Sequence, residues 1–320
     1  MAESLIVSIG PHIKDDLSTR KIMWAVTLSL VPAGAAGVFI FGIRALLIII
    51  LSVVSALATE ALMLAMRRKD VTAVWDGSAV LTGLLLAYNL PPQVPAWLPI
   101  AGSFFAIAIG KQVFGGLGHN IFNPALVGRA FLMLSWPVYM TTWQNPRWKV
   151  DAVTSATPLV LYKSGGFGLL HHISKWDLFM GNRGGCIGEV CVIALLAGAA
   201  YLLIKKYISW HIPIVYILTI GALSWIFNGR SGLLTGDALF FVLSGGLILG
   251  AFFMATDYVT SPLSARGKIV FGIGCGLLTF IIRKFSGYPE GVCYAILMMN
   301  AAVPMIDKYT FPKWFGWRKA

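Results

Sequence analysis

Charged side chains are scarce in this sequence, and the shortage excludes most soluble proteins. Only 12% of the 320 residues are charged, and just 13 of them are Asp or Glu. Soluble domains carry about 25% charged residues. Hydrophobic residues make up 58% of the chain instead, and the mean hydropathy is +0.78. Because a membrane-spanning helix satisfies its own backbone hydrogen bonds, the composition predicts an all-α integral membrane protein.

Cysteine is also rare, and its spacing excludes the usual metal-binding motifs. The four cysteines show neither the CxxC pattern nor the Cys/His spacing of iron–sulfur and zinc sites. We interpret them as buried apolar residues and expect no metal held by this chain. Residues 1–21 lack an apolar core, so no cleavable signal peptide is expected. The four cysteines are Cys186, Cys191, Cys275 and Cys293.

Apolar segments long enough to cross a bilayer recur along the whole chain. An even number of crossings places both termini on the same side of the membrane. The ten predicted spans are residues 22–40, 43–66, 71–90, 95–114, 120–140, 187–204, 210–227, 233–256, 267–282 and 291–307.

Basic residues are distributed unequally between the two sides of these spans. Fifteen fall on the side of the termini and four in the opposite short loops. Because positive charge gathers on the cytoplasmic side, we expect cytoplasmic termini in the inner membrane of a bacterium or archaeon, with residues 141–186 outside. The net charge of +12 thus reflects topology, and nucleic acid is not an expected partner. The fifteen are Lys14, Arg20, Lys21, Arg67, Arg68, Lys69, Lys111, Lys205, Lys206, Arg266, Lys268, Lys308, Lys313, Arg318 and Lys319; the four are Arg44, Arg230, Arg283 and Lys284.

The two halves of the chain show weak internal similarity. Residues 80–86 (VLTGLLL) resemble residues 242–248 (VLSGGLI), and each block leads to a proline-bearing loop and later to a glycine-rich break. Since a unit of five spans is odd, we expect two inverted five-helix repeats with interrupted helices, which place binding sites at the repeat interface. The expected parts are a cytoplasmic segment 1–21, a first repeat 22–140, an external loop 141–186, a second repeat 187–307 and a cytoplasmic tail 308–320.

One polar stretch, Asp151-Ala-Val-Thr-Ser-Ala-Thr-Pro158, stands out in the predicted external loop. Long ordered loops tend to carry function. Asp151 and Thr154 can form a turn through side-chain to backbone hydrogen bonds, which would present Thr157 to solvent. On these residues alone, an ordinary Ser/Thr-rich turn is the alternative.

A second polar block covers residues 110–125. Gly115 and Gly116 allow another group to approach the backbone closely. Asn120 and Asn123 are three residues apart, so we expect both amides on one helical face, where they suit the polar edge of a heterocycle. The alternative is structural, with both amides hydrogen-bonded to neighbouring helices.

Several ionisable residues fall within or beside the predicted spans, where charge is costly and often functional. Asp76 and Asp257 flank corresponding helices of the two units and are ion-pathway candidates, together with Asp307. Arg129 lies inside the fifth span and needs a carboxylate, carbonyl or phosphate partner. Other acids near span ends are expected to reach headgroup water. These acids are Glu60, Glu189 and Glu290, while Lys111 and His119 are expected to face cytoplasmic water.

The pattern Asp151-x-x-Thr154-Ser155-Ala156-Thr157 resembles the acceptor motif of flavin transferases, which join FMN through its phosphate to the last threonine. Ser155 stands where that motif more often has glycine. Together with the glycine-rich block, the ten-span layout and residues 254–262 (MATDYVTSP), it resembles the NqrB/RnfD family of membrane flavin subunits. The short N-terminal segment is more similar to the Rnf branch of this family than to the quinone-reductase branch.

This resemblance implies two flavin sites and a urea-channel-like fold. The first is covalent FMN on Thr157, with Asp151, Thr154 and Ser155 beside it. The second is a non-covalent flavin, riboflavin or FMN, held by the second polar block. The residues implied there are Asn120, Asn123, Gly115 and Gly116.

The resemblance also implies a function in electron transfer. The chain would pass electrons through flavin within a complex that links ferredoxin and NAD to Na⁺ or H⁺ translocation, and it would not be a complete enzyme alone. Implied partners are the other Rnf membrane flavin and iron–sulfur subunits, a flavin transferase for maturation, and membrane lipid. The alternatives are a subunit of a sodium-pumping quinone reductase and a urea-channel-like solute channel. A structural scaffold would explain neither polar block.

Overall fold

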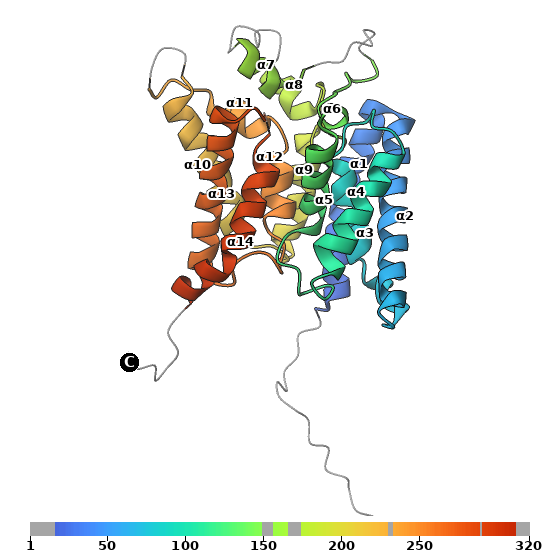
Figure 1. Ribbon diagram of the computed structural model, residues 1–320. Helices are drawn as coiled ribbons and strands as arrows, with labels where there is room; N and C mark the ends of the chain where they lie inside the picture. The colour runs from blue at the N-terminus through green and yellow to red at the C-terminus, as the bar shows by residue number, and fades with distance from the viewer. Residues whose placement is uncertain (1–16, 149–155, 166–173, 230–232, 289, 312–320) are drawn as a thin grey trace, which may run out of the picture.

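The computed structural model describes residues 17–148, 156–165, 174–229, 233–288 and 290–311. Every regular element in these ranges is a helix, and most of the helices stand side by side (Figure 1). The predicted all-α class is therefore confirmed. The motif residues Asp151, Thr154 and Ser155 lie outside the described ranges.

The first half of the chain forms one group of helices, coloured blue to green in Figure 1. Gly42 separates the two long helices that come first. The fourth helix runs directly into a π-helical turn, and an irregular segment, residues 113–123, precedes the fifth. The elements are α1 (Thr19–Phe41), α2 (Ile43–Met66), η1 (Val71–Asp76), α3 (Ser78–Tyr88), α4 (Trp97–Ile107), η2 (Ala108–Gln112), α5 (Pro124–Ser135) and α6 (Pro137–Met140).

The second half packs beside the first, below two short helices at one end of the molecule (Figure 1). Its central helix is broken at Ser244 and Gly245, and the continuation includes a second π-helical turn. The short helices are α7 (Pro158–Gly165) and α8 (Lys175–Met180). The others are α9 (Val192–Ile204), α10 (His211–Phe227), α11 (Ala238–Leu243), α12 (Leu247–Leu249), η4 (Gly250–Met254), α13 (Ala265–Phe285) and α14 (Val292–Thr310).

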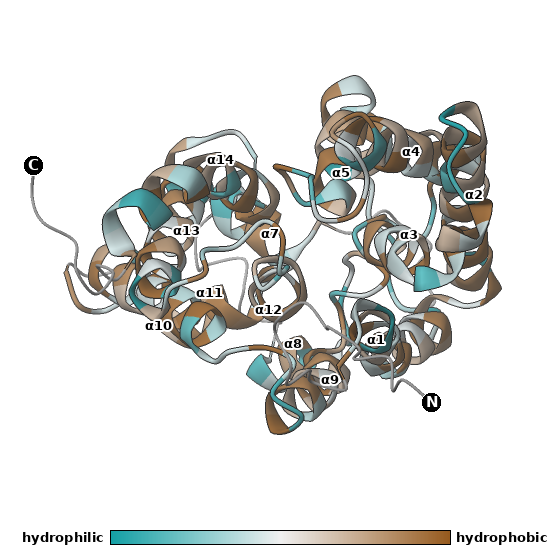
Figure 2. Ribbon diagram, turned by 90° about the horizontal axis from the view of Figure 1, so that it is seen from below, coloured by the Kyte–Doolittle hydropathy of each residue, from teal (hydrophilic) through white to brown (hydrophobic). Residues whose placement is uncertain are grey.

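Three helices of the described chain, α1, α2 and α13, are long and apolar enough to cross a membrane. Four shorter helices, such as α10, are also apolar. Figure 2 shows hydrophobic ribbon predominating in both groups of helices. The chain is therefore a multi-pass membrane protein. Three of the predicted spans are interrupted: residues 71–90 are divided between η1 and α3, residues 120–140 between α5 and α6, and residues 233–256 among α11, α12 and η4.

The two halves contact each other through two helix pairs, α1 with α9 and α5 with α14. Small residues allow the close approach of α1 and α9. A Cβ atom on Gly198 would lie 2.1 Å from the carbonyl oxygen of Ser29. A larger residue at this position would therefore push the halves apart.

Candidate functional site

A buried arginine joins the two halves of the molecule. Arg129 of α5 donates to Glu189 Oε1 at 3.0 Å, to Glu290 and to the side chain of Asn89. Asn89 directly follows α3, Glu189 precedes α9, and Glu290 precedes α14. The expected partner for Arg129 is thus found, and it consists of two carboxylates from the second half.

The irregular segments that follow α3 and precede α9 also form backbone hydrogen bonds with each other, and these bonds join the two halves. The amide of Ile187 donates to the carbonyl of Leu90, and the amide of Gly188 to the carbonyl of Tyr88, both at 3.1 Å. A Cβ on Gly188 would fall within the Tyr88 ring, at 2.2 Å from Cγ. Interrupted helices that face each other at an internal interface are typical of transporter binding sites.

The prediction that Glu189 and Glu290 reach headgroup water is wrong. Both carboxylates are buried and paired with Arg129. Their positions near span ends suggested exposure, but the chain just before α9 and α14 is mostly buried. Cys186 belongs to the same cluster, since its sulfur lies within 4.8 Å of a carboxylate oxygen from each glutamate. Arg129 forms ion pairs with both carboxylates.

Thr157 lies directly before α7 and faces inward. Its Oγ accepts a hydrogen bond from the amide of Val160 at 3.4 Å, so the residue caps the helix. The residue is only 5% exposed, and the expectation that the turn presents it to solvent is wrong. It shares a small cavity with Arg183, Glu189, Gly245 and Glu290. The threonine of the flavin motif therefore adjoins the central charge cluster.

Two further buried arginines stand beside this cavity. Arg183 donates to the carbonyl of Leu243 at 2.8 Å, and Arg283 donates to the carbonyls of Phe241 and Ser244 at 2.6 and 3.0 Å. Within the described chain, the Nε–H of each guanidinium makes no hydrogen bond. Sequence reasoning did not single out either arginine, because both were assigned to loops and span ends.

The charges around Thr157 do not cancel. Three guanidinium groups, on Arg129, Arg183 and Arg283, face two carboxylates, on Glu189 and Glu290. Three positive charges minus two negative charges leave one positive charge in the described surroundings. Because an uncompensated buried charge is strongly unfavourable, the site favours a bound anion with a single negative charge.

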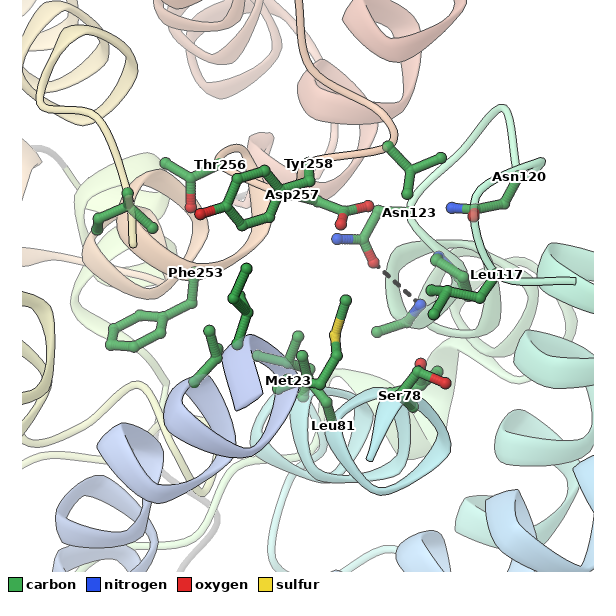
Figure 3. A pocket seen from close by; sticks show the side chains of 18 of the residues that line it. Met23, Ser78, Leu81, Leu117, Asn120, Asn123, Phe253, Thr256, Asp257 and Tyr258 are labelled. Carbon is green, nitrogen blue, oxygen red and sulfur yellow. Dashed lines mark hydrogen bonds between the residues drawn. The ribbon is translucent and has the colours of Figure 1, made fainter. Parts of the chain in front are cut away.

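A second cavity opens between the halves at the opposite end of the helices (Figure 3). Its lining includes Asn120, Asn123, Ser78 and Asp257. The cavity volume is about 70 Å³, whereas small-molecule sites typically measure about 300–1,000 Å³. A flavin ring would therefore fit only if part of the lining moved outward.

The two asparagines do not share a helical face as predicted, because α5 begins only at Pro124. Asn123 caps that helix: its Oδ1 accepts from the amides of Ala125 and Leu126, and its Nδ2 donates to the carbonyl of Met254. The structural alternative thus applies to Asn123. Asn120 differs, since its Oδ1 is buried without a hydrogen-bond partner in the described chain.

Gly115 and Gly116 lie outside the lining of this cavity. Their φ angles of +130° and +105° fall in the left-handed region that favours glycine. A Cβ on Gly115 would lie 3.2 Å from the His119 side chain. Both glycines therefore shape the turn that carries Asn120.

The three candidate ion-pathway aspartates do not form one site. Asp76 accepts hydrogen bonds from the amide and hydroxyl of Ser78 at 2.7 and 2.5 Å, at the start of α3. Asp257 accepts from Thr260 at 3.0 Å and lines the second cavity, where burial raises its pKa. Asp307 accepts from the amide of Leu263 at 3.2 Å.

Lys111 is buried, which contradicts its predicted exposure to cytoplasmic water. It is 1% exposed and donates to Glu60 Oε1 and to Ser78 Oγ, both at 2.5 Å. Glu60, expected to reach headgroup water, is buried as well. Lys111 belongs to the π-helical turn η2, which changes the direction of side chains relative to a regular helix. Helical periodicity alone could not reveal this pair.

The helical halves define a polytopic membrane protein, and the charge cluster buried between them, beside interrupted helices, is its candidate functional site. The chain belongs to the NQR2, RnfD, RnfE family, whose model matches residues 6–316. The resemblance seen in the sequence motifs is thereby confirmed.

Three relatives match nearly the full length, and each is a component of an ion-translocating oxidoreductase complex. The chain is 51% identical to a subunit of the proton-translocating ferredoxin:NAD(+) oxidoreductase complex of Clostridium ljungdahlii, over 98% of this chain and 96% of the relative. It is 49% identical to a subunit of the Na(+)-translocating ferredoxin:NAD(+) oxidoreductase complex of Acetobacterium woodii, with the same coverage. It is also 40% identical to a subunit of the ion-translocating oxidoreductase complex of Stutzerimonas stutzeri, over 93% and 92%.

Proposed function

We propose that this chain is an electron-transfer subunit of an ion-translocating ferredoxin:NAD(+) oxidoreductase complex and carries FMN esterified through its phosphate to Thr157. The names of the relatives support the complex. The single observation that carries the flavin assignment is the uncompensated positive charge around the buried Thr157. A phosphodiester has one negative charge, which matches that excess. When bound, FMN would supply one- and two-electron transfer chemistry that side chains lack.

The residues around Thr157 fit such an ester. Among the described residues, the Nε–H groups of Arg183 and Arg283 have no partner, so they can donate to phosphate oxygens. Gly245 leaves room in the cavity, since a Cβ there would lie 3.0 Å from Leu159 and 3.2 Å from Arg283. The positive end of the α7 helix dipole, at Pro158, also favours an anion. Esterification retains the Oγ atom that accepts from Val160, so the helix cap persists.

Burial of Thr157 implies an order of events during maturation. A flavin transferase must reach the hydroxyl, which lies inside the folded chain. We infer that the ester forms while α7 is displaced from Arg183 and Gly245, and that α7 packs afterwards.

The test of this assignment is flavin fluorescence in a denaturing gel. The chain is co-expressed with a flavin transferase, and the wild-type band is expected to fluoresce. Thr157→Ala should give a dark band, whereas Thr141→Ala, at an exposed threonine before the motif, should not. A dark wild-type band would contradict the assignment.

We also propose that the second cavity is the place of a non-covalent flavin, riboflavin or FMN. The unpartnered Oδ1 of Asn120 supports this proposal, because a flavin ring carries an N–H donor. Asn123 would act mainly through the helix cap. The ring would enter with an outward shift of part of the lining.

Two inverted repeats with cytoplasmic termini remain our proposal for the architecture. Equivalent helices make equivalent contacts: α2 packs on α4 as α10 packs on α13, and α4 packs on α5 as α13 packs on α14. Helices α1 and α9, which would correspond, run in opposite directions in Figure 1. The charge distribution in the sequence supports the orientation.

A solute channel fits the structure less well. Arg129, Glu189 and Glu290 fill the interface between the halves, where a channel of this symmetry would have its pore. For ion translocation, Asp76, Asp257 and Asp307 remain candidates. Both Na⁺ and H⁺ fit the proposal, since relatives of nearly equal identity are named for different ions.

A further inference from the structure

A third cavity, of about 400 Å³, lies next to α7. Aromatic side chains line it, from Tyr162 of α7, Phe227 of α10 and Phe241 of α11. Basic side chains complete the lining: Lys163, Arg283 and Lys284. The volume falls within the range of small-molecule sites, about 300–1,000 Å³. The proposed flavin sites leave this cavity without an assigned ligand, and we call it the outer cavity.

The outer cavity adjoins the surroundings of Thr157. Leu159 lines it and is two residues from Thr157, within α7. Arg283 also lines it, while its guanidinium stands beside Gly245, a residue of the Thr157 cavity. A group attached to Thr157 can therefore extend past Arg283 into the outer cavity.

The lining suits a flat ring that can take up negative charge. Tyr162 and Phe241 pack edge to face with centroids 5.0 Å apart, so together they form one aromatic side of the cavity, against which a planar ring can lie. No acidic residue lines the cavity within the described chain. Lys284 Nζ lies 5.4 Å from the centre of the Phe227 ring and donates to the carbonyl of Phe227 at 3.1 Å. Lys163 donates to the carbonyls of Ser286 and Tyr288.

We propose that the outer cavity seats the isoalloxazine ring of the flavin attached to Thr157. The inference rests on the proposed function and adds the position of the ring. The phosphodiester lies at Arg183 and Arg283, the ribityl chain passes Leu159, and the ring packs between Tyr162 and Phe227. Two electrons from the ferredoxin-linked complex and one proton would leave the ring with one negative charge, which the ammonium groups of Lys163 and Lys284 would stabilise.

The experiment uses the full chain, co-expressed with a flavin transferase, purified in detergent and stripped of free flavin. Mass spectrometry first establishes whether FMN is present on Thr157 in each variant. Tyr162→Phe removes the electron-rich phenol that quenches a stacked flavin, and fluorescence is expected to rise several-fold. Lys284→Gln removes a positive charge, and the flavin midpoint potential is expected to fall. Tyr309→Phe and Lys308→Gln, at the far end of α14, should change neither quantity.

The outcomes separate this inference from the proposed function. Absence of FMN from the wild-type chain defeats the proposed function itself. FMN on Thr157 with unchanged fluorescence in Tyr162→Phe and unchanged potential in Lys284→Gln overturns the ring position alone. Co-purified anionic lipid that is lost in Lys284→Gln, with flavin properties unchanged, would assign the outer cavity to lipid and likewise overturn the inference.

Discussion

Arg129 donates to Glu290, which lies 161 residues further along the chain, and this bond connects the first half of the protein to the second. The same guanidinium holds Glu189. Without it, two carboxylates would face each other in a buried site. The ion pair between Arg129 and Glu290 therefore holds the two halves together and also contributes to the charge environment of Thr157.

Replacing Arg129 should therefore destabilise the protein strongly. Breaking a buried ion pair from one side typically costs about 3–5 kcal/mol, so Arg129→Ala should lower the thermal unfolding midpoint in detergent. Arg44→Ala, at an exposed arginine of α2, is the control. Adding Glu189→Gln and Glu290→Gln to the Arg129 variant should restore part of the stability. An unchanged midpoint for Arg129→Ala would show that the pair contributes nothing.

A second prediction concerns the contact between α1 and α9. Gly198→Ala places a Cβ against the carbonyl of Ser29, and overpacking of this kind costs about 1–3 kcal/mol. Gly287→Ala is the matched control, because a Cβ there meets no atom within 4 Å. The thermal unfolding midpoints of the two variants are measured, and the midpoint of Gly198→Ala is expected to be the lower. Equal midpoints would mean that the halves do not rely on this close approach.

The sequence predicted much of this arrangement. Long apolar segments with helix caps specify helices, and the isolated Arg129 required a partner. Other features depend on chain breaks that periodicity cannot locate. The π-helical turn that buries Lys111 is one, and the late start of α5, which places Asn120 off the helix, is another. Thr157 faces inward because distant residues, among them Gly245, form the cavity around it.

Asn120 should determine the binding of the non-covalent flavin. Loss of a buried amide partner costs about 1–3 kcal/mol, or roughly one to two decades in affinity. Asn120→Leu should therefore lose extractable flavin and keep the covalent one, as measured by acid extraction and absorbance. Thr141→Ala, at an exposed threonine outside the lining of this cavity, serves as the control. Stoichiometric free flavin in Asn120→Leu would assign this residue a structural role.

The cation dependence of turnover should show whether Asp76 and Asp257 take part in ion translocation. Asp76→Asn and Asp257→Asn remove charge and nearly preserve shape, so each should raise the cation concentration for half-maximal turnover of the assembled complex if Na⁺ is the ion. Burial raises the pKa of Asp257, so its ionised form destabilises the fold. The stability advantage of Asp257→Asn should therefore grow as pH rises above the ordinary aspartate range. Unshifted ion titrations in both variants would restrict these residues to the turns that they stabilise.

The central claim is that FMN is esterified to the buried Thr157 beside an excess of positive charge. Its most direct test is mass spectrometry of the intact chain co-expressed with a flavin transferase, followed by peptide mapping. The account predicts a mass increase of one FMN minus one water, located on the peptide that contains Thr157 and absent from Thr157→Ala. Thr157→Ser, which keeps the hydroxyl, should retain the adduct. An adduct that persists in Thr157→Ala, or maps to another residue, would contradict the account.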